Sequence, residues 1–331
     1  MARGRHWSRW AAILAVVVIA AALVVTHRGR DRGASPLPSG TTSPSAATSP
    51  FTGLPQRAPA PVLAVKIDNV AAARPHTGLT KADLVYVEEV ESGLSRILAV
   101  FSSHLPPRVG PVRSARESDL ELLRQFGRPA LAYSGAQGKL LPVIARAAVD
   151  DVSPAHAPQA YTRDSARQAP HNLYAAPAEL LAAAPSASAS HDIGFRFGPA
   201  PASGTPTTDR TVRFPSARVA FHWSAQQSRW LASFDGRPET ATEGGQLGPP
   251  TVVIQYVNVR ASGYHDRWGN SSPYSETVGS GRAVVLRDGR AYDGRWSRPS
   301  ATGGTAFTTT GGRPLNFAKG QVWVVLAPKS G

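Results

Sequence analysis

An unbroken apolar run near the start of the chain constrains what the rest can fold into. Trp10 to Val25 carries no charged or polar side chain, and Arg3, Arg5 and Arg9 precede it in the order of an export signal. Its sixteen residues fall just short of the 17 to 25 that usually span a bilayer. No clear small-residue cleavage site follows, so we expect an uncleaved signal-anchor helix within residues 1–32, with secretion after cleavage as the alternative.

A Gly-, Ala-, Ser-, Pro- and Thr-rich segment with hardly a charge covers residues 33–61. Such a composition buries too little apolar surface to offset chain entropy, so we predict a disordered spacer. Together, anchor and spacer predict a single-pass membrane protein whose remaining residues fold outside the cytoplasm.

Composition limits the classes of function. The chain of 331 residues has no cysteine, which excludes disulfides, thiolate metal sites, cysteine nucleophiles and a lipidated cysteine. Its formal charge is +14, and only five of the 36 basic residues are Lys. Arg suits forked contacts to carboxylate or phosphate, although an Arg-rich composition also arises without selection for anions. We expect no nucleic-acid partner, because the basic residues are scattered and the protein is predicted to lie outside the cytoplasm.

The fold expected from hydrophobic patterning is α+β. A mixed α/β domain is predicted over residues 62–195 and a β-rich domain over residues 205–331. In the first, strands are predicted at Val62–Asp68, Leu84–Val90, Leu94–Phe101 and Leu131–Ser134, and helices at Ala115–Phe126 and Leu140–Ala148. Ser114 and Glu117 have the spacing of a capping box at the start of the first helix.

Hairpins dominate the second half. Its strongest predicted strands are Thr251–Val259 and Gln321–Leu326, and Asp235-Gly236, Asp288-Gly289 and Gly311-Gly312 are turn pairs. Its large rings can form a platform for glycan, but rings on alternating strand positions are more often core. These rings are Trp223, Trp230, Trp296 and Trp323.

Several blocks of the sequence resemble the YerB-like lipoprotein family, a bacterial family of unknown function. The block Arg108 to Arg116 (RVGPVRSAR) is specific, and residues 64–69, 73–83, 91–96 and 171–174 add to it. The resemblance covers nearly the whole chain after residue 50 and implies a membrane-tethered, extracytoplasmic protein. Members are typically anchored through a lipidated cysteine, which the signal-anchor would have to replace here.

Two groups of side chains are candidates for chemistry. Arg113, Ser114 and Arg116 flank the predicted helix start, where an anion is favoured, and the ligand candidates extend to Arg74, Arg96, His171 and Asn172. A buried ion-pair network that fixes the loop is an equally good interpretation. The carboxylates Asp68, Asp83 and Glu91 follow or precede separate strands and can act as acid, base or metal ligands if they converge.

No cofactor can be named from these residues, because the chain has neither a phosphate loop nor a dinucleotide fingerprint. The leading hypothesis is therefore an envelope protein that binds an anionic or glycan ligand, such as a cell-wall polymer or precursor. The alternative is an enzyme acting on phosphate-containing cell-wall precursors.

Overall fold

A computed structural model describes residues 47–266 and 268–329 of the chain. The predicted anchor at residues 1–32 and the first part of the predicted spacer lie outside these residues. Within them, no helix is both long and apolar enough to cross a membrane. The described part is mostly β-sheet with few helices, in agreement with the strand-rich pattern of the sequence.

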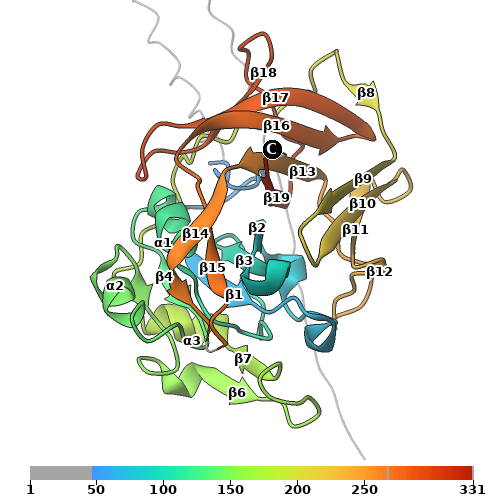
Figure 1. The fold of residues 1–331 in the computed structure, drawn as a ribbon. Coiled ribbons are helices and arrows are strands. Elements are labelled where there is room, and N and C mark those ends of the chain that lie inside the picture. The colour runs from blue at the N-terminus through green and yellow to red at the C-terminus, as the bar shows by residue number, and fades with distance from the viewer. Residues whose placement is uncertain (1–46, 267, 330–331) are drawn as a thin grey trace, which may run out of the picture. The chain divides into compact units, whose positions relative to one another are not determined.

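The first half carries all three α-helices of the described residues and a set of short strands (Figure 1). The strands are β1 (Leu63–Ile67), β2 (Leu84–Glu89), β3 (Ser95–Phe101), β4 (Ala130–Ala132), β5 (Asp150–Asp151), β6 (Tyr161–Arg163) and β7 (Leu173–Ala175). The helices are α1 (Glu117–Leu123), α2 (Leu141–Arg146) and α3 (Pro177–Ala182). Short 3-10 turns lie at Ala71–Ala73, Leu79–Lys81, Glu91–Gly93, Arg124–Phe126 and Pro158–Ala160.

The second half is built from strands alone. They are β8 (Thr205–Pro206), β9 (Asp209–Arg213), β10 (Arg218–Ser224), β11 (Arg229–Phe234), β12 (Arg237–Pro238), β13 (Thr251–Val257), β14 (Val259–His265), β15 (Ser271–Ser275), β16 (Gly279–Arg287), β17 (Arg290–Arg298), β18 (Ala306–Thr309) and β19 (Val322–Pro328). The predicted hairpins are confirmed, since β10 pairs with β11 and β16 with β17 in antiparallel register.

One large sheet runs through both halves, in the order β18-β17-β16-β13-β19-β2-β3-β1-β4-β5, with β8 paired to β17. The joining strand is β19, which pairs in parallel with β13 on one side and with β2 on the other. The domain boundaries drawn from the sequence stay a prediction, but the two halves share backbone hydrogen bonds across this seam.

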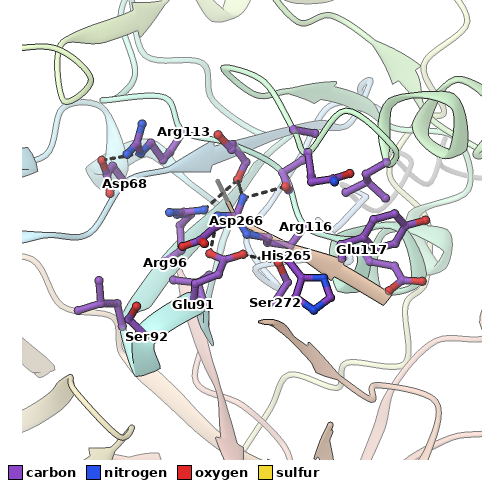
Figure 2. A pocket seen from close by; sticks show the side chains of 18 of the residues that line it. Asp68, Glu91, Ser92, Arg96, Arg113, Arg116, Glu117, His265, Asp266 and Ser272 are labelled. Carbon is purple, nitrogen blue, oxygen red and sulfur yellow. Dashed lines mark hydrogen bonds and ion pairs between the residues drawn. The ribbon is translucent and has the colours of Figure 1, made fainter. Parts of the chain in front are cut away.

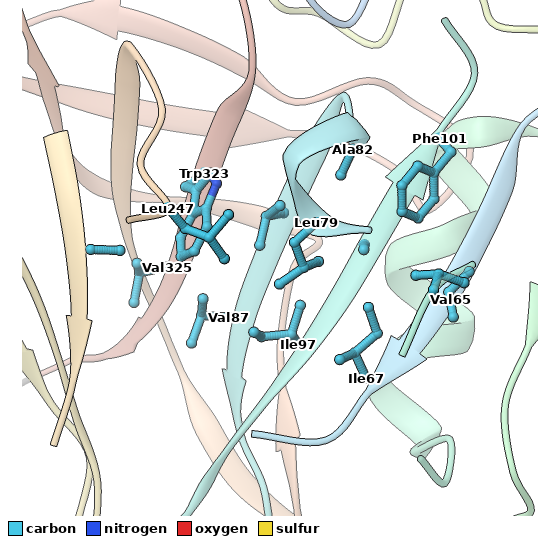
Figure 3. Close-up of a cluster of buried hydrophobic side chains, with 14 of the residues drawn as sticks. Val65, Ile67, Leu79, Ala82, Val87, Ile97, Phe101, Leu247, Trp323 and Val325 are labelled. Atoms are coloured by element: carbon cyan, nitrogen blue, oxygen red, sulfur yellow. The ribbon is translucent and has the colours of Figure 1, made fainter. Parts of the chain in front are cut away.

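Alternating side chains of the shared strands supply two cores, one on each face of the sheet. On one face Val65, Val87 and Ile97 pack with Trp323 (Figure 3), and the four-stranded sheet β12-β11-β10-β9 covers the same cluster with its own rings. On the other face Tyr86 and Leu98 pack against the side chains of α1 and α2. Because every second residue faces each core, polar residues on these strands are forced to one side or the other.

The tryptophan platform is not formed. Trp230, Trp296 and Trp323 are buried, and Trp223 packs at the edge of the first core. Trp323 lies edge-on to Phe221 with ring centroids 5.9 Å apart. Trp230, Trp296 and Trp323 are core residues, as alternate positions on strands favour, and they offer no surface to a glycan.

Helix α1 begins two residues later than its sequence signal predicted. Its N-cap is Arg116, whose backbone N–H donates to Asp119 Oδ2 at 2.6 Å, and no bond from Ser114 caps the helix. The predicted capping box is therefore wrong, because Asp119 takes the place that Glu117 was expected to fill. With seven residues, α1 is also too short for its dipole to be the basis of an anion site.

Part of the predicted spacer is folded. Residues 47–61 form turns and short bridges, and Phe51 is fully buried with its ring edge-on to Phe126 at 5.5 Å between centroids. One aromatic residue in an otherwise small and polar segment is enough to tie it to the core, which corrects the prediction for these residues.

Replacing Phe51 with Ala should lower the free energy of unfolding by about 3 kcal/mol, because it empties a site in the core. Urea unfolding of residues 47–331 measures this. Leu54→Ala is the matched control, since Leu54 is 41% exposed in the same segment and should change stability by less than about 0.5 kcal/mol. Equal effects of the two substitutions would mean that the segment does not dock through Phe51.

Candidate functional site

A pocket of about 900 Å³ opens at the end of the large sheet where β1 and β2 finish. Seven of the ten residues predicted as site candidates line it, and they come from loops that follow β1, β2 and β6, from β3, and from the segment before α1. They are Asp68, Glu91, Arg96, Arg113, Ser114, Arg116 and His171. The sequence blocks far apart in the chain therefore converge on one site.

Three predicted residues lie elsewhere. Asp83 precedes β2 while Glu91 follows it, so the six residues of the strand separate the two carboxylates by about 20 Å. Asp83 instead accepts the backbone N–H groups of Ser102 and Ser103. Asp68 and Glu91 line the same pocket but Asp83 does not, so the condition that all three carboxylates converge is not met. No cluster of three or more His, Asp or Glu side chains able to hold a metal occurs within residues 47–266 and 268–329.

Arg74 and Asn172 also point away from the pocket. Arg74 pairs with Asp235 at 2.8 Å and lies over the ring of Phe234. Asn172 uses its amide to bind the backbone carbonyls of Asp164 and Arg167 and so shapes the loop that carries His171. Both side chains bind other groups of the protein, and neither lines the pocket.

A buried ion network lies directly beneath the pocket, on the face of the sheet that α1 covers. The ammonium group of Lys66, on β1, contacts Glu88 and lies 2.7 Å from Asp119. All three side chains are almost fully buried. Burial lowers the pKa of Lys66 to about 8 against the opposing charge of Asp119, so the ammonium form still dominates at neutral pH. The network fixes α1 to the sheet, because Asp119 also caps the helix.

Charged side chains that line the pocket also form ion pairs, and the first of these joins Arg116 and Glu91 (Figure 2). Arg116 Nη2 donates to Glu91 at 2.5 Å, and Glu91 also accepts the hydroxyl of Ser272 from β15. Burial raises the pKa of Glu91, but the bond and charge of Arg116 outweigh it and hold that pKa below its ordinary value. This pair ties the β2–β3 turn to both α1 and the second half.

A second pair of contacts centres on Asp68. Its Oδ2 atom lies 3.1 Å from Arg113 Nε and 2.7 Å from His171 Nδ1, and the carboxylate is 2% exposed. The Asn69 backbone N–H donates to Oδ1 at 3.0 Å. Asp68 is thus an organising anion that positions one arginine and one histidine at the pocket.

Arg96 differs from the other arginines of the pocket. Within the described residues it makes no ion pair, and its one hydrogen bond runs from Nη1 to the carbonyl of Ser114 at 3.3 Å. Its Nε atom is buried without a partner there, and the residue is only 8% exposed. Glu88 stands opposite it on β2 but is bound to Lys66. Burial, followed by the charge of Arg116, lowers the pKa of Arg96 to about 9, and it stays a cation at neutral pH.

The second half contributes a wall that sequence reasoning missed. The hairpin β14–β15 reaches from the C-terminal half toward α1 (Figure 1), and its residues Tyr264, His265, Asp266, Trp268 and Ser272 line the pocket. Trp268 is 72% exposed at its tip. The hairpin is held by Glu121 of α1, which accepts the hydroxyl of Tyr274 at 2.9 Å and three bonds from residues 277–278. Glu121 is one of three acidic residues in the short sequence of α1, so the sequence alone did not single it out.

Comparisons with known proteins agree with this architecture. Residues 51–190 match the N-terminal domain and residues 210–324 the C-terminal domain of a protein family of unknown function, DUF3048. The chain belongs to this family. A relative from Bacillus subtilis (strain 168), named "Putative lipoprotein YerB", is 25% identical over 276 residues, which is 80% of this chain and 81% of the relative.

The crystal structure of the YerB protein from Bacillus subtilis has the same fold. It superposes with a TM-score of 0.73 at 22% identity and covers 86% of this chain and 97% of YerB. The resemblance to the YerB-like family is therefore confirmed. The relative's name records a lipoprotein, whereas this chain has no cysteine to carry a lipid.

Acidification should reduce the stability that the Glu91–Arg116 contact adds to the fold. In the unfolded chain Glu91 gains a proton near pH 4.5, while the folded protein resists protonation, so the stability that the contact adds above pH 4.5 is lost as the pH falls further. Urea unfolding at several pH values should show wild type losing more stability on acidification than Glu91→Gln. Glu179 is exposed, so Glu179→Gln should lose stability with falling pH as wild type does. If the stability of Glu91→Gln falls with pH in parallel with wild type, the Glu91–Arg116 contact does not stabilise the fold.

Proposed function

We propose that the protein is a membrane-tethered, extracytoplasmic binding protein whose pocket takes an anionic group of a cell-envelope ligand. The observation that carries the proposal is Arg96, a buried guanidinium that lines the pocket and has, among the described residues, an unpartnered Nε and no carboxylate of its own. Phosphate and carboxylate match the fork geometry of such a group and form charge-assisted bonds with it.

The surroundings of Arg96 favour a specific contact over a general positive surface. Arg113 and Arg116 flank it, yet each is held by its own carboxylate, Asp68 or Glu91. In the described part of the chain the Arg116 Nε atom lacks a hydrogen-bond partner and remains available for a further contact. Over these same residues, the pocket therefore offers one free cation and two preorganised ones, which suits a single anionic group better than a long polyanion.

The location rests on separate support. The apolar run at Trp10 to Val25 is the predicted protein anchor, and the relative from Bacillus subtilis carries the name "Putative lipoprotein YerB". A protein tether in one member and a lipid tether in another would hold the same fold outside the cytoplasm.

Substituting Arg96 should weaken anion binding. Arg96→Lys keeps the charge but removes the fork, so the Kd for inorganic phosphate should rise about tenfold, and further for Arg96→Gln. Isothermal titration calorimetry measures both, with circular dichroism to confirm folding. Arg74→Lys is the matched control, because Arg74 is similarly shielded but outside the pocket. Equal phosphate affinity in Arg96→Gln and wild type would overturn the proposal.

A second candidate is an enzyme acting on phosphate-containing cell-wall precursors, and one observation favours it. Asp68 accepts from His171 Nδ1, which leaves Nε2 without a hydrogen-bond partner among the described residues and free to accept a proton. This is the arrangement of an oriented general base, beside a guanidinium that can hold a phosphate.

Hydrolysis of bis(4-nitrophenyl) phosphate separates the two candidates. An enzyme should release nitrophenol, and His171→Gln should abolish turnover while phosphate binding persists. His156→Gln is the control, because His156 is exposed outside the pocket. Turnover that is undetectable in wild type, or unchanged in His171→Gln, would remove the general-base assignment and leave the binding proposal intact.

A further inference from the structure

The pocket has a second unsatisfied group, of opposite charge. Glu117 lines it, and within residues 47–266 and 268–329 the buried Glu117 Oε2 atom has no hydrogen-bond partner. The other three carboxylates of the pocket all have partners. Asp68 contacts Arg113 and His171, and Glu91 binds Arg116 and Ser272. Asp266 accepts hydrogen bonds from backbone and amide groups of its own loop. Buried acceptors are normally paired, so Glu117 is an exception that calls for a partner.

Nearby cations do not fill that role. Arg116 is turned toward Glu91. Arg260 binds Glu276 at 2.9 Å and lies over the ring of Tyr274, 4.2 Å from its centroid. Burial raises the pKa of Glu117, which is the expected response of a carboxylate that has lost water without gaining a donor.

Arg96 and Glu117 occupy different sides of the pocket. In Figure 2, Asp68 and Arg96 lie on one side of Arg116 and Glu117 lies on the other. Arg96, which has an unpartnered donor, and Glu117, which has an unpartnered acceptor, thus line one cavity of about 900 Å³. A simple anion would bind Arg96 but would leave Glu117 Oε2 without a hydrogen-bond donor.

We infer that the ligand is zwitterionic, with an anionic group bound at Arg96 and an ammonium group, separated from it by a short spacer, bound at Glu117 Oε2. This rests on the proposed function and specifies its ligand class: an amine-bearing phosphate or carboxylate of the cell envelope. Glu117 acts as the specificity residue, because an ammonium group supplies both the charge and the donors that the carboxylate lacks.

The test uses pairs of probes that differ only in the ammonium group. The full chain in detergent micelles is titrated calorimetrically with 2-aminoethyl, 4-aminobutyl and 6-aminohexyl phosphate, each beside the alkyl phosphate of the same length. We expect at least one amino probe to bind about tenfold more tightly than its partner, and the length giving the largest ratio reports the spacing of the two subsites.

Glu117→Gln should bring that ratio close to one by weakening the amino probes, while the alkyl phosphates still bind at least as tightly as they bind wild type, because a negative charge has left the pocket. The matched control is Glu179→Gln, an identical change in the first turn of α3, outside the pocket, and it should keep the wild-type ratio. Alkyl phosphates that bind with no amino preference, or a preference that survives in Glu117→Gln, would overturn the zwitterion inference alone. Failure of every probe to bind would overturn the proposed function and this inference with it.

Discussion

One buried ammonium group underlies the whole site. Lys66 binds both Glu88 and Asp119 in the core between the sheet and α1. Removing one partner of such a network leaves an uncompensated buried charge and typically costs about 3–5 kcal/mol, close to the scale of a domain's total stability. The position of α1, and with it the arginine segment before the helix, depends on this contact.

The same contact determines what Arg96 can do. Glu88 is the residue directly across from Arg96 on the neighbouring strand and would be its natural ion-pair partner. Because Glu88 binds Lys66, Arg96 has no ion-pair partner among the described residues. Its single hydrogen bond within that part of the chain goes to the carbonyl of Ser114 at the pocket. Lys66 therefore has two effects: it neutralises Glu88 and Asp119, and it leaves Arg96 as the cation without an ion pair in this part of the described structure.

Much of the local structure could be predicted from the sequence, and the reasons are physical. Short apolar runs rich in strand formers, such as the one that begins β2 (Leu84–Glu89), predict buried strands. The short turn at Glu91–Gly93 predicts that the two strands it joins are antiparallel neighbours, as β2 and β3 are. Arg96, Arg113, Arg116 and His171 could be named as candidates because they lie in family blocks, but the sequence left open whether they line one pocket. Asp83 was misplaced because its strand's direction was not used: the two ends of one strand cannot meet.

Other features had no local signal. Nothing within Val322–Pro328 reveals that it pairs with β2, more than 200 residues earlier, because strand partners are chosen by global packing. The hairpin tip that walls the pocket lies in a polar stretch typical of any loop. Phe51 was overlooked since composition averaged over a segment hides a single aromatic residue.

The seam at β19 has a consequence for biogenesis. Until that strand emerges, β2 and β13 each present an unpaired edge, and such edges invite pairing with other chains. A polypeptide threaded across a membrane from its N-terminus would deliver this strand after every other one in the described fold. Completion of the sheet must then follow translocation of nearly the entire chain, and a truncation that removes β19 would leave both of those strand edges open.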